Sequence, residues 1–394
     1  MCSSTVEAFI ECIDDLSYIR KGEEEYSIGI QDIVIWTGAG FSKAWDKNFP
    51  LNEKLFFLGT LESIESAKYP NLRQYISSVL GWSLKKEIDF DFIKMLNYRL
   101  SVQQAYPELQ NRYMDQQLAE KIQNELSLWV FQKIQLLLEG KTDTREKGNI
   151  HRFFNYLSHQ STTSYKGGAG FRLNFISTNY DFCIENALGL GKEDEEYFLY
   201  RGFSPVRNNG HSINNLQIED DPHISLLKLN GGLEIIEDGG KYSIDYCLET
   251  LASYYSDIHR KKSLILPNHE QDYSSPYYRM IFPKAVELLR KAKFLLFLGT
   301  SLPDEDVLFK HLLSHFAEQE ADYYKKYVFC ISKEPKKETE IIKERILATF
   351  PQYEKIVDHV FMYSKGLDSF IDDFVKINTE MHPLESNWKG WWDQ

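Results

Sequence analysis

The chain has 394 residues, of which 43% are hydrophobic and 14% aromatic, and this composition excludes a globally disordered protein. Its 45 Lys and Arg residues are outnumbered by 58 Asp and Glu residues, which gives a net charge of −13. Duplex DNA and anionic membranes repel such a charge, so we expect neither direct duplex DNA binding nor membrane association.

The cysteines and the apolar runs predict a reduced, cytoplasmic protein without structural zinc. No two cysteines stand close enough to form a CxxC pair, and their odd number disfavours a disulfide scaffold: Cys2, Cys12, Cys183, Cys247 and Cys330. Residues 1–10 lack the basic and apolar regions of a signal peptide. The longest apolar run, at 294–298, is too short to cross a bilayer.

The N-terminal part of the chain predicts a helix, then a strand, then a helical region. Residues 5–20 repeat apolar side chains at helical spacing, and the β-branched run at 30–36 predicts a buried strand. Residues 52–140 are polar and helix-prone, and the clearest helix is predicted at 114–138. Within them, Asp89-Phe90-Asp91-Phe92 fits either a pair of metal ligands or acids at a helix start, where the helix dipole favours them.

From residue 172 onward, short apolar runs alternate with helical or polar stretches, which is typical of a parallel sheet covered on both faces. The predicted fold class is therefore α/β, a Rossmann-like doubly wound parallel sheet with a large helical insertion. The expected strands lie at 173–177, 226–229, 264–266, 294–298, 327–331 and 359–362. The predicted division is an N-terminal helix at 1–29, the sheet domain at 30–51 and 171–375, the insertion at 52–170, and an aromatic tail at 376–394.

Two segments leave the question of self-association open. The apolar face of the helix at 5–20 and the tail containing Trp388, Trp391 and Trp392 are each either core packing or a contact between subunits.

Three predicted strands end in small or hydrogen-bonding residues, where ligands of open α/β sheets gather. Gly38-Ala39-Gly40 follows the first strand, as in turns that approach a diphosphate, but Lys43 takes the place of the last glycine of a full GxGxxG pattern. Thr178-Asn179-Tyr180-Asp181 follows a second strand, and its Asn and Asp fit either a ligand site or an Asx-turn and helix cap. Gly299-Thr300-Ser301 follows a third strand and suits ribose or phosphate oxygens.

A further segment, Pro267-Asn268-His269-Glu270, follows the apolar run at 264–266. It fits a lining segment of the same site and an ordinary turn equally well.

Four motifs in order, TGAGFS, STNYD, LKLNGG and FLGTSL, resemble the sirtuin family, and most closely its bacterial branch in antiphage defence. The resemblance implies an NAD-binding Rossmann-like domain. It assigns Gly38, Ala39, Gly40 and Ser42 to the diphosphate; Gly299, Thr300 and Ser301 to the adenosine side; and Asn179 and Asp181 to the nicotinamide ribose. It also counts Thr178 among the cofactor-binding residues. Ser332 is matched more loosely to the adenine ribose.

The chain departs from the family pattern in two ways. It lacks the four cysteines of the deacylase zinc module, which disfavours protein deacylation. Asn230 stands where the family has its catalytic histidine, and an amide cannot serve as a general base near neutral pH. We expect Asn179 and Asn230 to orient a water or a ribose hydroxyl and Asp181 to stabilise charge at the anomeric carbon. His223 or His211 is an alternative source of a base.

The sequence therefore predicts an NAD hydrolase that releases nicotinamide and ADP-ribose, with NAD as substrate and with no metal. The expected biological role is antiphage defence by NAD depletion. The competing hypothesis is a non-catalytic NAD- or ADP-ribose-binding sensor or assembly subunit, since Asn230 replaces the histidine. The resemblance also implies a HerA-like hexameric ATPase as a partner. We expect a homo-oligomer as well, for which the apolar helix and the aromatic tail offer surfaces.

Overall fold

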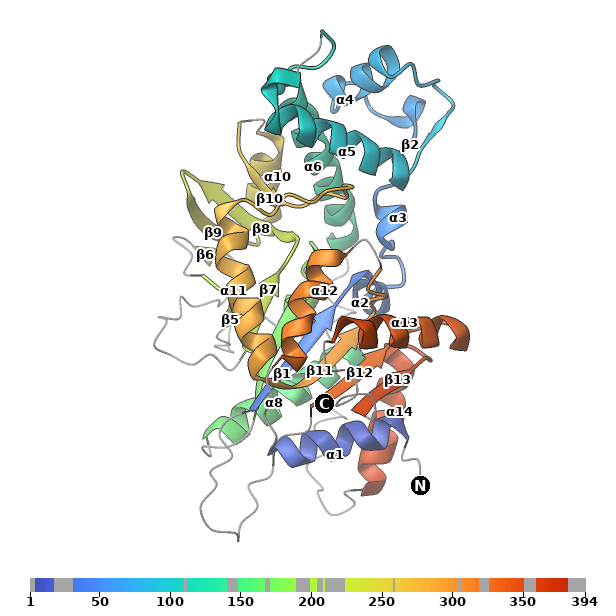
Figure 1. Cartoon of the computed structure of the whole chain (residues 1–394), viewed down its shortest axis with the longest axis vertical. Coiled ribbons are helices and arrows are strands. Elements are labelled where there is room, and N and C mark those ends of the chain that lie inside the picture. Colours follow the sequence, from blue (N-terminus) through green and yellow to red (C-terminus); the bar gives the residue numbers. More distant parts are fainter. Residues whose placement is uncertain are drawn as a thin grey trace.

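The computed structural model resolves a parallel sheet covered by helices on both faces, with a helical arm standing above it (Figure 1). The structure describes residues 4–17, 31–109, 112–139, 148–166, 171–188, 199–203, 208–209, 224–257, 259–303, 306–318, 326–350 and 359–381. The predicted fold class is confirmed.

The main sheet has seven strands in the order β13-β12-β11-β1-β4-β7-β5, and every neighbouring pair is parallel. Its strands are β1 (Gln31–Thr37), β4 (Phe171–Ser177), β5 (Leu199–Tyr200), β7 (Ile224–Lys228), β11 (Ala292–Leu298), β12 (Tyr327–Ile331) and β13 (Val360–Tyr363). The chain leaves β1 for β4 on one side and later returns to β11 on the other. The topological switch point of the sheet therefore lies between β1 and β11.

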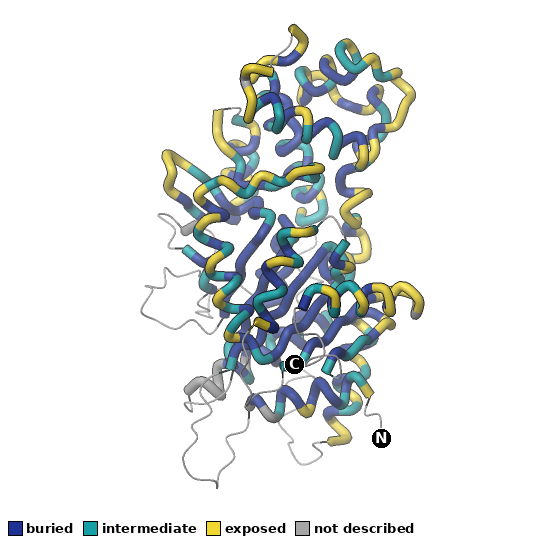
Figure 2. The backbone as a smooth tube through the Cα atoms, in the orientation of Figure 1, coloured by how far each residue is buried: buried dark blue, intermediate teal, exposed yellow. Residues whose placement is uncertain are grey.

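Side chains of each central strand alternate between two cores, because successive residues of a strand point to opposite faces. In β1, Ile33 and Ile35 belong to one core, and Val34 and Trp36 to the other. Both faces of the strands are buried, as Figure 2 shows for the centre of the sheet. This explains why the strands are continuous apolar runs rather than alternating ones.

Helices on the two faces complete the layers. One core includes residues of α1 (Thr5–Ser17), α2 (Ala39–Trp45), α8 (Asn149–Lys166), α9 (Cys183–Ala187) and α14 (Leu367–Met381). The other includes residues of α11 (Pro276–Lys291), α12 (Val307–Ser314) and α13 (Lys336–Thr349).

The apolar face of α1 is part of the core of its own domain. Phe9 is 1% exposed and makes edge-on ring contacts with Phe294, Phe329 and Phe370. Of the two readings that the sequence left open for this helix, core packing is the one that the structure supports. The aromatic tail with Trp388, Trp391 and Trp392 lies outside the described residues.

The strand expected at 264–266 is a correction to the prediction. Strand β10 (Lys262–Leu264) belongs to a second, four-stranded sheet in the order β10-β8-β9-β6, and it pairs with β8 (Gly231–Asp238) in antiparallel fashion. The other members are β9 (Lys241–Asp245) and β6 (Asn208–Asn209). An apolar run of three residues does not reveal which sheet receives it, because the pairing partners are set by tertiary contacts.

The insertion after β1 forms a helical arm, which we define as residues 52–138. It contains α3 (Asn52–Leu55), α4 (Pro70–Gln74), α5 (Phe90–Ala105), α6 (Gln116–Leu138) and the pair β2 (Gly59–Thr60) and β3 (Glu87–Ile88). Asp89 caps α5 by accepting a hydrogen bond from the Phe92 N–H at 2.9 Å, and Asp115 caps α6 in the same way. The Asp89 motif is therefore a helix start.

The arm is joined to the second sheet through α6, which packs against α10 (Leu248–Ser256). Phe131 of α6 and Tyr255 of α10 stack with their ring centroids 4.8 Å apart. In contrast, α8 packs against β4 and α14, so this last helix of the predicted insertion covers the main sheet instead of extending the arm. The domain limits at 29, 51, 170 and 375 remain predictions.

Candidate functional site

The register of the main sheet brings the candidate turns to one edge. Thr37 of β1 lies beside Ser177 of β4 and Leu298 of β11, so the chain leaves all three strands at the same level. Ser177 in turn lies beside Lys228, and Leu298 beside Ile331. The turns that begin at 38, 178, 229, 299 and 332 therefore meet at the carboxyl edge of the sheet, as expected of a ligand site in an open α/β fold.

The glycines of the first and fourth motifs, TGAGFS and FLGTSL, contact each other directly at the switch point. The Gly40 N–H donates to the Gly299 carbonyl at 2.8 Å, and the Gly38 N–H donates to the Leu298 carbonyl at 3.1 Å. A Cβ on Gly40 would lie 2.7 Å from the Gly299 Cα, and a Cβ on Gly38 would lie 2.9 Å from the Gly299 carbonyl oxygen. Packing of the two turns thus accounts for these glycines, beside the ligand contact that the sequence suggested.

We predict that Gly299→Ala destabilises the protein by about 2–5 kcal/mol, the sum of a left-handed backbone and an overpacked contact. Gly299 has φ of 61°, and a Cβ there would lie 2.3 Å from the Gly40 carbonyl carbon. Gly239→Ala is the matched control, because Gly239 has φ of 58° and no atom within 4 Å of its added Cβ. Urea unfolding measures both. Equal losses for the two variants would contradict the packing argument.

Ser42, Asn179 and Asp181 form one hydrogen-bonded group that joins the first and second motifs. The Asn179 Nδ2 donates to the Gly38 carbonyl at 2.8 Å and to the Ser42 Oγ at 2.9 Å. The Ser42 Oγ donates to the Asp181 Oδ2 at 2.6 Å. The Asp181 Oδ1 accepts from the Cys183 N–H at 2.9 Å at the start of α9. Asn179 therefore fixes the glycine turn, and Asp181 orients Ser42 and closes an Asx-turn at the start of α9.

Asn230 contacts the same group of residues from the turn after β7, the strand that neighbours β4 on the side away from β1. Its Nδ2 donates to the Thr178 carbonyl at 3.0 Å, and the Thr178 N–H donates to the Thr37 carbonyl at 3.1 Å. The Asn230 Oδ1 lies 3.3 Å from the Tyr273 hydroxyl, whose one proton is shared with the nearer Gln271 Oε1. The bond to Thr178 therefore orients the amide beside residues 178–181, which we call the Asn179 loop.

The fourth motif, FLGTSL, contributes a strained turn, and the end of β12 contributes a buried hydroxyl. Leu302, directly after Gly299-Thr300-Ser301, has φ of 43°, a strained value for a residue with a side chain. Its side chain is buried and anchors the turn in the core of α11 and α12. The Ser332 Oγ is buried at the end of β12 and has no hydrogen-bond partner among the described residues. An orphaned hydroxyl there suits a ligand oxygen.

Comparison with known protein families identifies a domain in this part of the chain. Residues 173–350 match the SIR2-like domain. A comparison with curated proteins found no match. The match supports a sirtuin-like family and an NAD-related activity. It begins in β4 and therefore leaves out β1 and the Gly38–Ser42 turn, which the fold places against the matched region.

The fold brings the residues that we expect to contact NAD together at this edge of the sheet. Some follow strands of the matched region, and the others follow β1, which lies outside it. Gly38, Ala39, Gly40, Ser42, Thr178, Asn179, Asp181, Asn230, Gly299, Thr300 and Ser301 all lie in turns that follow aligned strand ends. Their individual roles remain predictions. His211 and His223 lie outside the described residues.

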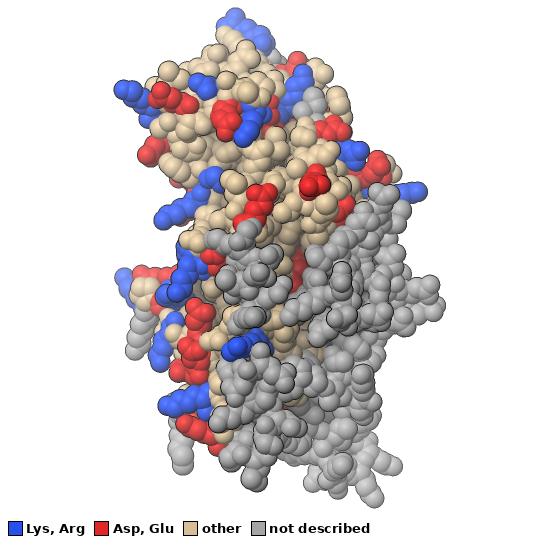
Figure 3. All heavy atoms as spheres, turned by 180° about the vertical axis from the view of Figure 1, so that it is seen from behind, with Lys and Arg blue, Asp and Glu red and all other residues tan. Residues whose placement is uncertain are grey.

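Within the described part of the chain, no group of three or more His, Cys, Asp or Glu side chains is arranged to hold a metal ion. Likewise, none of the helices in these ranges is long and apolar enough to cross a membrane. Figure 3 shows acidic and basic side chains interspersed over the described part of one face.

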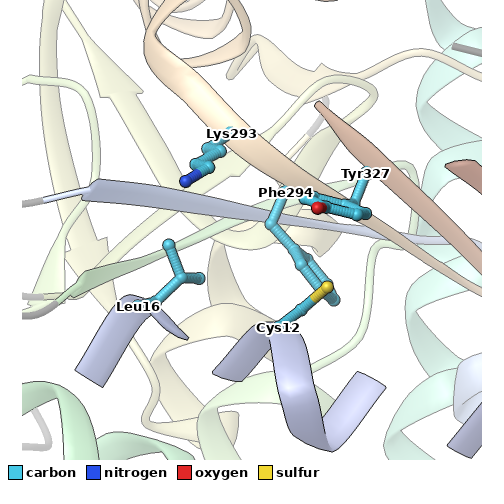
Figure 4. Close-up of a pocket in the computed structure, with 5 residues that line it drawn as sticks. All are labelled: Cys12, Leu16, Lys293, Phe294 and Tyr327. Atoms are coloured by element: carbon cyan, nitrogen blue, oxygen red, sulfur yellow. The ribbon is translucent and has the colours of Figure 1, made fainter. Parts of the chain in front are cut away.

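A small hollow lies away from this site. It is lined by Cys12 and Leu16 of α1 and by Lys293, Phe294 and Tyr327 at the amino ends of β11 and β12 (Figure 4). The strands run from there to the switch point, so this hollow lies at the opposite edge of the sheet from Gly299.

A buried network of four charges lies behind the Asn179 loop. The ammonium of Lys228, 1% exposed as a side chain, contacts the Glu185 Oε1 at 2.9 Å, the Glu234 Oε1 at 3.0 Å and the Asp181 carbonyl at 2.6 Å. These three acceptors use all three N–H groups of the ammonium. Arg201 pairs with Glu234 and also donates to the Tyr246 hydroxyl at 2.6 Å. Two cations thus balance two carboxylates.

Burial and the cations act in opposite directions on the two carboxyl groups of this network. Burial raises the pKa of Glu185 above its ordinary value, against the attraction of the Lys228 ammonium. The pKa of Glu234 is lowered, because Lys228 and Arg201 together outweigh its burial. Because Lys228 also holds the Asp181 carbonyl, the network ties the Asn179 loop to β8.

We predict that Cys247 is alkylated by iodoacetamide at least roughly tenfold faster than Cys183 or Cys330, because the thiolate is the reactive form. Cys247 is exposed, and hydrogen bonds from Thr250 lower its pKa, whereas burial raises the pKa of both other thiols. Peptide mass spectrometry after timed labelling measures the three rates, and Cys247→Ser removes the fast site. Equal labelling of Cys183 in the native protein would contradict the prediction.

Sequence reasoning missed the residues that support the site. Lys228 carried a signal, because a lysine at the end of an apolar strand needs a buried partner. Glu185, Arg201, Glu234 and Tyr273 are far apart along the chain, and nothing in their local sequence indicates that they converge.

Proposed function

We propose that this protein hydrolyses NAD to nicotinamide and ADP-ribose. The bond between C1′ of the ribose and N1 of nicotinamide breaks with its electron pair passing to nicotinamide, which leaves as a neutral ring. The oxygen of a water forms the new bond to C1′, and the proton that this water loses goes to solvent. The reaction therefore needs a positioned water and a held ribose rather than acid catalysis of the leaving group.

The observation that carries the proposal is the joining of Gly38, Ser42 and Asn179 at the switch point of a chain that matches the SIR2-like domain. These hydrogen bonds fix the proposed diphosphate turn and the proposed ribose-facing loop relative to each other. The Asn179 Nδ2 uses both of its N–H groups on protein acceptors, so its Oδ1 is the atom that we propose faces a ribose hydroxyl or the water.

Asn230 is the second residue to which we assign a role in the proposed reaction. Its Nδ2 donates to the Thr178 carbonyl and its Oδ1 lies beside the Tyr273 hydroxyl, which favours a task of orientation rather than of proton transfer. The loss of a general base costs about 10²–10⁴ in rate, so we expect a slow hydrolase. We propose that Asp181 acts mainly through Ser42 and the start of α9, because both of its carboxylate oxygens accept hydrogen bonds there.

A second candidate function is a non-catalytic module that binds NAD or ADP-ribose. The observation that favours it is Asn230 itself, an amide in the place of the family's histidine. Such a module would retain the hydrogen bond between Asn179 and the Gly38 carbonyl. It would bind the nucleotide without cleaving the nucleotide.

Chromatography of NAD incubated with the purified protein separates the two candidates. Release of nicotinamide and ADP-ribose in equal amounts supports the hydrolase. Calorimetric binding of ADP-ribose with no product under any activating condition supports the binding module. Formation of O-acyl-ADP-ribose from an acylated peptide would instead indicate a deacylase, which the missing cysteine module disfavours.

We further propose a role in antiphage defence by NAD depletion, in a homo-oligomer and together with a HerA-like hexameric ATPase. The order of the four motifs supports this proposal. Light scattering of the protein alone and mixed with such an ATPase tests the assembly, and NAD measurement in infected cells tests the role.

A further inference from the structure

The segment after β10 lies between the helical arm and Asn230, and we call residues 265–273 the strap (Figure 1). On one side, the Ile265 N–H donates to the Asn230 carbonyl at 2.9 Å. The Tyr273 hydroxyl lies 3.3 Å from the Asn230 Oδ1, and its one proton is shared between that oxygen and the nearer Gln271 Oε1, which also belongs to the strap. The strap therefore holds the backbone of Asn230 and contacts its side chain. A shift of the strap would move this residue directly.

The other side of the strap is held by α5 of the arm. The Asn97 Nδ2 donates to the Leu266 carbonyl at 3.2 Å and to the Pro267 carbonyl at 2.9 Å, and Asn97 is only 3% exposed. One helical turn later, the Ser101 Oγ accepts from the Asn268 Nδ2 at 2.8 Å. A buried amide that donates to two successive carbonyls fixes the path of the backbone, because each lost partner costs about 1–3 kcal/mol.

A further contact fixes the strap relative to the Asn179 loop. The Tyr180 hydroxyl, next to Asn179 in the chain, donates to the Ile265 carbonyl. Ile265 thus contacts Asn230 through its N–H and Tyr180 through its carbonyl oxygen, while the next two carbonyls are held by Asn97. The strap is the structural link from the arm to both asparagines of the site.

We propose that Asn97 is a positioning residue: by clamping the strap, α5 of the helical arm orients Asn230 for the reaction. This proposal rests on the proposed NAD hydrolysis, and it gives the arm a task at a site to which it contributes no residue of the four motifs. Sequence reasoning gave no hint of it, because Asn97 is a single polar residue in a helical stretch.

The test replaces Asn97 by Leu, which has a similar size but no donor. We expect kcat for NAD to fall about 10- to 100-fold, since a small misplacement of a catalytic group has a cost of this size. Binding of ADP-ribose should stay within about threefold of the wild type, because the contacts with the glycine turns do not change. Amide hydrogen exchange in peptides covering 228–231 and 265–273 should be at least roughly tenfold faster than in the wild type.

Glu125→Leu is the matched control within the arm. Glu125 is buried on α6 and accepts hydrogen bonds from the Asn71 N–H at 3.1 Å and the Leu72 N–H at 2.7 Å, so its loss weakens the arm away from the strap. We expect this variant to lose stability but to keep kcat within about twofold of the wild type and to leave exchange at 228–231 unchanged.

Asn97→Ser, which keeps a small polar side chain on the helix, serves if Asn97→Leu does not fold. Wild-type kcat and unchanged exchange at 228–231 in the Asn97 variants would overturn the proposal. An equal fall of kcat in the Asn97 and Glu125 variants would also overturn it, since the arm would then act only through its overall integrity. If the wild type itself does not hydrolyse NAD, the proposed function fails, and the exchange at 228–231 still decides whether Asn97 holds Asn230.

Discussion

Asn179→Ala is expected to lower NAD turnover by at least about 10²-fold, the usual cost of misplacing the groups that position a reacting centre. Asn179 is 8% exposed, and its amide is the only side-chain donor to both Gly38 and Ser42 among the described residues. Without it, the Gly38 carbonyl loses its hydrogen bond from the loop that follows β4. Asp181 keeps the hydrogen bond that it accepts from Ser42, but the Ser42 hydroxyl is no longer held from the side of Asn179. Chromatographic assay of nicotinamide release measures the effect.

Two comparisons make this prediction specific. Asn179→Asp keeps the size of the side chain but removes both donors and places a carboxylate against the Gly38 carbonyl, so it should be as inactive as the alanine variant. Asn186→Ala, a half-buried asparagine of the neighbouring α9, should retain turnover close to that of the wild type. Full turnover in Asn179→Ala would remove this residue from the proposed site.

Lys228→Met is expected to destabilise the protein by about 3–5 kcal/mol, the cost of leaving a buried charge without its partner. The change leaves Glu185 and Glu234 with Arg201 as the one remaining cation of the network. It also removes the donor to the Asp181 carbonyl, so the Asn179 loop keeps only its backbone bond from the Leu233 N–H of β8 to the Tyr180 carbonyl, at 3.2 Å, among the described contacts with that strand. Urea unfolding followed by circular dichroism measures the loss of stability, and the NAD assay measures the loss of activity.

A charge-balanced double variant separates these two effects of Lys228. Lys228→Met combined with Glu185→Gln removes one charge of each sign, so we expect it to recover a large part of the lost stability. It cannot restore the hydrogen bond to the Asp181 carbonyl, and we therefore expect NAD turnover to remain low. A double variant with wild-type turnover would show that Lys228 serves charge balance alone.

The sequence predicted the main sheet well because its strands are buried on both faces. Runs such as 294–298 and 327–331 have no polar interruption, and each is followed by a helix or a small-residue turn, which leaves few alternatives to a parallel arrangement. The run at 264–266 was wrongly given to this sheet, because a short strand at the edge of an antiparallel sheet has the same local composition.

The candidate site was predicted where it depends on local pattern and missed where it depends on long-range contacts. Gly38, Asn179 and Gly299 follow strand ends, so their meeting at one edge followed from the fold class alone. Tyr273 and Asn97 reach Asn230 only through the path of the strap, which no spacing in the chain encodes.

By itself, the amino-acid sequence determined the parallel sheet, the strand-end turns and their order along the chain, because apolar runs and small-residue turns are local properties. The tertiary structure alone decided that the glycines pack turn against turn, that Lys228 joins a four-charge network, and that the helical arm holds the strap over Asn230. These contacts join residues far apart in the chain, and their energies depend on burial, which arises only when the elements pack together.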